Sequence, residues 1–115
     1  MNDYENTLHI NGKDYTLKFT LNVMEEIQEH YGTVDKWAEL TDGAGGEPNA
    51  KALIFGFTAM LNEGMEIKAE EMGEPFTPLS RKQVGRLITQ LGIENVEKAM
   101  KQTVIESAQS VEKNV

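Results

Sequence analysis

The side chains best suited to chemistry are few and scattered in this sequence. His9 and His30 are its two histidines, neither has a further ligand at a useful spacing, and the chain contains no cysteine. A zinc site or an activated nucleophile needs several such groups that converge. We therefore expect structural roles for both histidines, and we expect no catalytic residue, no cofactor and no bound metal.

A run of carboxylates leads up to Glu74. Its other members are Glu63, Glu66, Glu70 and Glu71. This density of acidic groups could hold a divalent ion weakly, and a small metal-dependent enzyme is the alternative that such a site would favour. A charge run of this kind is more often a solvated surface, and no pair stands out by its spacing as an acid and a base. The sequence therefore favours a protein that is not an enzyme.

Composition and charge bound the class of protein. The chain has 115 residues, of which 39% are hydrophobic and 26% are charged, so it is apolar enough to fold and fits one domain over residues 1–115. We expect fraying at residues 1–6 and 111–115. The net charge is −8 and no basic cluster offsets it, which argues against binding to DNA or RNA.

Neither export nor membrane insertion is indicated. The first five residues are polar and acidic, unlike a secretory signal, and the longest apolar run, at residues 52–57, is far shorter than a membrane span. We therefore expect a soluble protein of the cytoplasm.

The clearest local pattern is a β-hairpin. Residues 8–10 and 15–19 alternate with period two around Asn11-Gly12, a pair that favours a tight type I′ turn. This register places Leu8 opposite Tyr15. One face of the hairpin would then carry Leu8, Ile10, Tyr15, Leu17 and Phe19, and the other Thr7, His9, Asp14, Thr16 and Lys18.

Helical spacing begins near Leu21. A first helix would end at Gly32, and a second, short helix would run from Thr33 or Asp35 to Leu40. Residues 42–48, rich in glycine, predict a loop.

A third helix should run from Asn49 to Asn62 and be closed by Gly64. It is apolar nearly all round, which is typical of a central helix. Beyond it we expect irregular structure from Met65 to Leu79, with at most one helical turn.

Two further helices complete the prediction. Ser80 and Gln83 form a capping box that starts a helix ending at Gly92, and a last helix begins near Ile93. The sequence thus predicts an α+β fold in which an N-terminal β-hairpin packs on a mostly α-helical body of four to five helices.

One apolar cluster could contact a partner. It lies in a segment rich in Glu and Pro, where adaptable methionines would suit an irregular surface. The other interpretation is that these side chains fold back to cover the core beneath the third helix, and the single tryptophan poses the same choice. The candidate partner-binding residues are Trp37, Met65, Ile67, Met72, Phe76 and Leu79.

The N-terminal pattern also carries a resemblance. Residues 8–22 read LHINGKDYTLKFTLN, and a Glu-rich helix follows as far as Tyr31-Gly32. This order resembles the tail assembly chaperones of long-tailed phages and prophages, which open with a hairpin of the type I-x-I-N-G-K-x-Y-x-L-x-F. The likeness extends through the helical body, including LSRKQVGRLI at residues 79–88, and covers about the whole chain.

The resemblance implies a function. Such a chaperone binds the tape-measure protein, keeps its helices soluble, and helps tail-tube protein subunits to polymerise around it. It implies a place in the host cytoplasm, absence from the mature virion, and no catalytic residues. Because a small chaperone must cover a long partner in many copies, we also expect self-association. Another phage morphogenesis protein, such as a head–tail connector or a minor tail component, is the alternative within the binding class.

Overall fold

The computed structural model describes residues 6–43 and 46–113, with side-chain environments for residues 7–43 and 46–108. Its elements confirm the predicted α+β fold, with a hairpin followed by helices. They are β1 (Asn6–Ile10), β2 (Lys13–Leu17), α1 (Leu21–Tyr31), α2 (Val34–Thr41), α3 (Ala50–Met72), α4 (Arg81–Leu91) and α5 (Ile93–Lys113).

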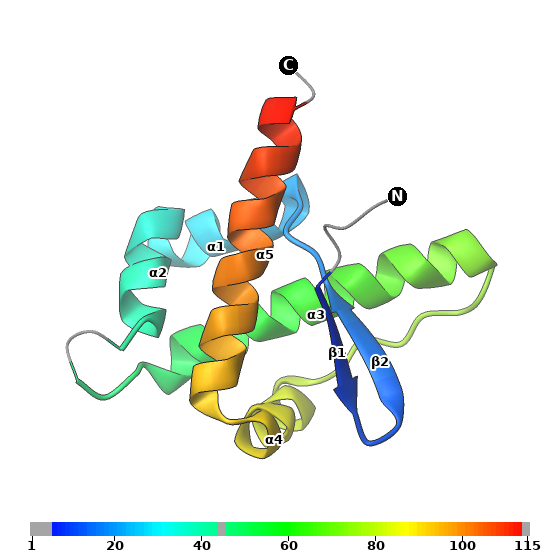
Figure 1. Cartoon of the computed structure of the whole chain (residues 1–115), viewed down its shortest axis with the longest axis horizontal. Helices are drawn as coiled ribbons and strands as arrows, with labels where there is room; N and C mark the ends of the chain where they lie inside the picture. Colours follow the sequence, from blue (N-terminus) through cyan, green and yellow to red (C-terminus); the bar gives the residue numbers. More distant parts are fainter. Residues whose placement is uncertain (1–5, 44–45, 114–115) are drawn as a thin grey trace.

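Helix α3 lies at the centre of the arrangement. It runs across the whole molecule in Figure 1, with α1 and α2 at one end, α4 beneath it, and α5 crossing it. It packs against β2 and against every other helix. The fully buried side chains of Phe57, Met60 and Leu61 come from this helix, which agrees with its predicted central position.

The hairpin has the predicted register. Asn11 and Gly12 have φ values of 52° and 78°, as a type I′ turn requires, and Ile10 pairs with Lys13 across it. The predicted apolar face turns towards the helices. Of that face, Ile10 and Leu17 are buried, and Leu8, Tyr15 and Phe19 are partly buried against the core.

Gly64 does not end α3, so this prediction was wrong. A Cβ at this position would lie 1.8 Å from the carbonyl oxygen of Thr16, which shows that β2 lies directly against the helix backbone there. The amide of Lys18 also donates to the carbonyl of Met60 at 3.2 Å. The glycine permits a close approach of strand to helix, and the helix continues beyond it.

The segment expected to be irregular is therefore helical in its first half. Residues 65–72 belong to α3, and Gly73 ends the helix in a left-handed conformation with φ of 66°. Glu, Lys, Ala and Met predominate in this stretch and all favour helix. The return segment is held to α3 by Asn62, whose side chain accepts from the Leu79 amide at 2.8 Å and donates to its carbonyl at 3.1 Å.

Several other helix boundaries lie at predicted caps. Thr33 accepts a hydrogen bond from the first turn of α2, and Gly32 ends α1. Thr20, which was not predicted as a cap, accepts a hydrogen bond from the first turn of α1. The capping box of Ser80 and Gln83 is formed, and Gly92 separates α4 from α5.

Of the two ends expected to fray, Asn6 lies in β1 and residues 111–113 lie in α5. Residues 1–5 and 114–115 lie outside the described part of the chain. None of the helices in that described part has the length and apolar character needed to cross a membrane.

Candidate partner-binding groove

A groove of about 450 Å³ lies between α2 and α5, both of which pack on α3. Trp37 of α2 and Met100 of α5 form its floor, and each is almost completely buried. The remaining apolar lining comes from Val34, Ala38, Val104 and Ile105.

The position of Trp37 is fixed by α3. Its indole N–H donates to the carbonyl of Ala52 at 3.0 Å, and a Cβ on Gly56 would lie 2.2 Å from the ring. The N–H side of the ring therefore lies close against the backbone of α3, and the 3% of Trp37 that is exposed contributes to the groove. Trp37 is thus both a core residue and part of the groove floor.

One end of the groove is acidic. Asp42 ends α2, and Glu94 and Glu97 lie in the first turns of α5, so three carboxylates line this end. Burial raises the pKa of Glu97, and the nearby charges of Asp42 and Glu94 raise this pKa further. Like charges therefore gather here in a partly desolvated setting, where repulsion is screened less than at an open surface.

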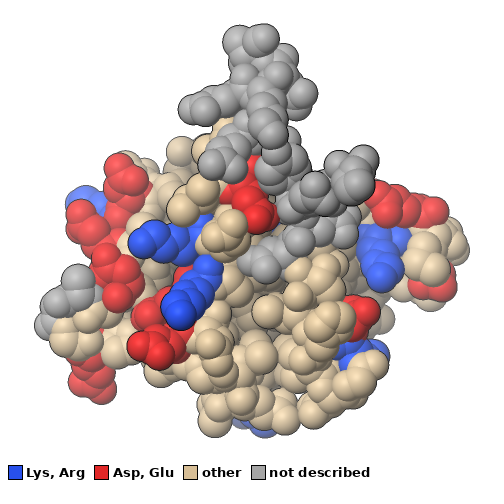
Figure 2. All heavy atoms as spheres, viewed as in Figure 1, with Lys and Arg blue, Asp and Glu red and all other residues tan. Residues whose placement is uncertain are grey.

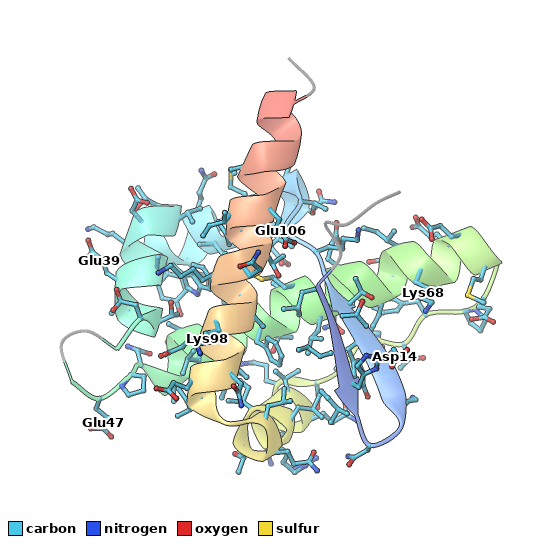
Figure 3. The ribbon with its side chains drawn as sticks, viewed as in Figure 1. Asp14, Glu39, Glu47, Lys68, Lys98 and Glu106 are labelled. Atoms are coloured by element: carbon cyan, nitrogen blue, oxygen red, sulfur yellow. The ribbon has the colours of Figure 1, made fainter. Side chains whose placement is uncertain are left out.

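Basic side chains follow along α5. Lys98 and Lys101 line the groove, and within the described part of the chain neither forms a salt bridge. Figure 3 shows Lys98 on the side of α5 that faces α2, whereas Glu39 points outwards from the far side of α2. In Figure 2, acidic and basic side chains lie close together over this part of the molecule.

The other end of the groove is mainly apolar, with one carboxylate, Asp35, in the first turn of α2. Val34 begins α2, and Val104 and Ile105 are the lining residues furthest along α5, so the two helices run in opposite directions beside the groove (Figure 1). Ile105 is 43% exposed. From Glu94 to Ile105 an α-helix rises about 16 Å, or roughly three turns. This length matches a short helical segment of a partner.

The cluster predicted at Met65–Leu79 lies elsewhere. Met65, Ile67 and Met72 lie in the half of α3 that extends away from α2 and α5 (Figure 1), and Met72 is 58% exposed. Phe76 is partly buried in the return segment, and Leu79 packs against the core. The structure therefore does not bring these five residues together with Trp37.

Sequence reasoning missed the α5 half of the groove. No residue of the last helix was singled out from the sequence as a partner contact. The available signal was Ile105, because this apolar residue follows Val104 and widens the apolar face of the helix beyond what one buried face needs. In the structure Met100 is buried and Ile105 lies at the rim.

The histidines and the acidic run have local contacts. His9 contacts Asp14 across the hairpin, and the ring of His30 lies 4.4 Å from that of Phe55. Glu63 accepts hydrogen bonds from Thr20 at 2.6 Å and from Asn22 at 3.3 Å, which ties α1 to α3. Among the described residues, no group of three or more His, Asp or Glu side chains is placed to hold a metal ion.

Comparison with known proteins yields no relative: no family model matches the chain, and no curated protein or solved structure matches it significantly.

Proposed function

We propose that this chain is a tail assembly chaperone of a long-tailed phage or prophage. It binds helical segments of the tape-measure protein, keeps them soluble, and assists polymerisation of the tail-tube protein. The resemblance of the N-terminal hairpin and its following helix to that family supports the proposal. The observation that carries it is the groove between α2 and α5, whose apolar floor and three-turn length suit one face of an amphipathic helix.

The size of the groove sets the strength of a single contact. Burying one Leu-sized side chain contributes about 1.5–3 kcal/mol, and a three-turn helix places two or three such residues on one face. Association costs at least about 4 kcal/mol in lost translation and rotation. One groove therefore binds weakly and reversibly, and a long partner is covered stably only by many self-associating copies.

Co-expression tests this function. The chain is produced with an affinity tag together with the tape-measure protein encoded nearby, and the two are expected to co-purify. Ile105→Glu replaces an apolar side chain of the groove by a carboxylate and should lower the recovered tape-measure protein at least about fivefold, since the partner's apolar stripe would then lie against a charged group. Ile105 is already 43% exposed, so the variant should still fold.

Met72→Glu is the matched control. It makes the same kind of change at an exposed apolar side chain outside the groove. Met72 is 58% exposed and is the last residue of α3. The substitution should leave the recovery of the tape-measure protein unchanged, whereas loss of binding in this variant alone would favour the Met65–Leu79 cluster as the contact surface. Stoichiometric amounts of the chain in purified virions, measured by mass spectrometry, would instead support a connector or a minor tail component.

A further inference from the structure

The groove between α2 and α5 differs in chemistry along its length. Three carboxylates, those of Asp42, Glu94 and Glu97, line one end. Val34 and Ile105 line the other end, together with a single carboxylate, that of Asp35. An occupant that filled the groove would meet both ends at once. Its own charge distribution is therefore constrained.

We propose that this groove takes an amphipathic partner helix that lays an apolar stripe on Trp37 and Met100 and places a lysine or arginine at the acidic end. This inference rests on the proposed function, and it names the partner chemistry that the same groove selects.

The acidic end favours a cation for electrostatic reasons. Glu97 is half-buried, and its raised pKa reports burial together with repulsion from Asp42 and Glu94. An ammonium or guanidinium group placed among these carboxylates relieves that repulsion. An acidic side chain at the same position would add a fourth negative charge.

The middle of the groove adds a second constraint. Lys98 and Lys101 form no salt bridge within the described residues, so both ammonium groups remain available to a carboxylate on the partner. The partner helix is therefore basic in the turn that meets Glu94 and tolerates acidic residues in the turns beside Lys101. Because three carboxylates lie at one end and one at the other, the groove favours one direction of the partner helix over the reverse.

A second copy of this chain fits the groove poorly. Its most basic helix is α4, with Arg81, Lys82 and Arg86, but the apolar residues Val84 and Ile88 of that helix are buried in its own core. The α4 helix of another copy could thus bring basic side chains to the groove, but no apolar stripe to lie on its floor.

Two synthetic peptides of about 18 residues test the inference, a length at which a helix can form in water. Both carry the same leucine stripe, and they differ in having either two lysines or two glutamates at one end of it. Fluorescence anisotropy measures their binding to the full chain at low salt. The lysine peptide is expected to bind about tenfold more tightly or better.

Charge reversal in the protein should reverse this preference. Glu94→Lys combined with Glu97→Lys is expected to favour the glutamate peptide. Glu94→Gln with Glu97→Gln leaves only Asp42 at that end and is expected to reduce the difference. Glu25→Lys with Glu29→Lys changes the net charge by the same amount on the exposed surface of α1, and it should preserve the preference for lysine. Circular dichroism checks that each variant is folded.

The inference is overturned if neither peptide binds, if both bind equally, or if the α1 control reverses the preference as well. It is also overturned if the lysine peptide dissociates a dimer of the chain, because a second copy would then occupy the groove. Loss of the peptide preference with intact co-purification of the tape-measure protein removes this inference alone. Failure of that co-purification removes the proposed function, whatever the peptides show.

Discussion

At the scale of single residues, the side chains that shape the groove also stabilise the fold. Trp37 is held by its hydrogen bond to Ala52 and by the missing side chain at Gly56, so its ring cannot move far without disturbing α3. Glu97, by contrast, does not stabilise the fold when it is charged. The fold raises the pKa of its carboxyl and so disfavours its charged form. Perturbed pKa values gather at binding and catalytic sites, and Glu97 lies at one end of the groove.

The raised pKa of Glu97 predicts a pH-dependent effect on stability. The folded chain holds the Glu97 proton to higher pH than the unfolded chain, whose carboxyl titrates near the ordinary value of 4.5. Stability is therefore lost as the pH rises from that value through the folded pKa. Glu97→Gln should raise the free energy of unfolding at pH 7, and the gain should vanish below about pH 4, where Glu97 is protonated in both states.

Urea unfolding at several pH values measures this gain. Glu25→Gln is the control, because it removes one negative charge from an exposed position on α1. An equal gain at pH 7 for both variants would mean that only the net charge of −8 matters, and that the surroundings of Glu97 contribute nothing.

At the scale of elements, much of the fold could be predicted because local signals determine it. The Asn11-Gly12 turn, the Ser80 capping box and the glycines at 32 and 92 each act within a few residues, and each lies where it was predicted. Gly64 misled the prediction because a glycine within a helical pattern can end the helix or admit a neighbouring backbone. The approach of Thr16, which decides between them, comes from a distant part of the chain.

Because β2 lies directly against α3, we expect that adding one methyl group at Gly64 lowers the stability of the fold. Gly64→Ala would place a Cβ 1.8 Å from the Thr16 carbonyl oxygen, so the hairpin has to move. Alanine gains up to about 1 kcal/mol in helix propensity, but overpacking typically costs about 1–3 kcal/mol and here involves backbone. We expect a net loss of about 1–2 kcal/mol in the free energy of unfolding, measured by urea denaturation.

Gly85→Ala is the matched control for this substitution. It lies within α4, and its added Cβ would meet only Ile54 Cδ1 at an ordinary 3.6 Å. It should be neutral or stabilising by up to about 1 kcal/mol. A Gly64→Ala protein as stable as the Gly85→Ala protein would show that the hairpin does not lie against α3 as described.

At the scale of the whole molecule, the groove arises because two helices pack side by side on α3 without filling the space between them. Helices α2 and α5 are far apart in sequence, and both pack on α3, which leaves the space between them open. Sequence patterns predict which face of each helix is apolar, but not which two faces border the same space. Trp37 could therefore be singled out from the sequence, whereas its neighbours Met100 and Ile105 could not.

The most direct test of the account is to map the surface that a tape-measure segment contacts. The chain contains one tryptophan, so the indole N–H of Trp37 gives a single signal in a ¹⁵N-correlated NMR spectrum. We predict that a bound helical segment of the tape-measure protein shifts this signal together with the amides of α2 and of residues 94–105, and leaves those of residues 65–79 unchanged. Shifts confined to residues 65–79, or none anywhere, would contradict a partner-binding groove between α2 and α5.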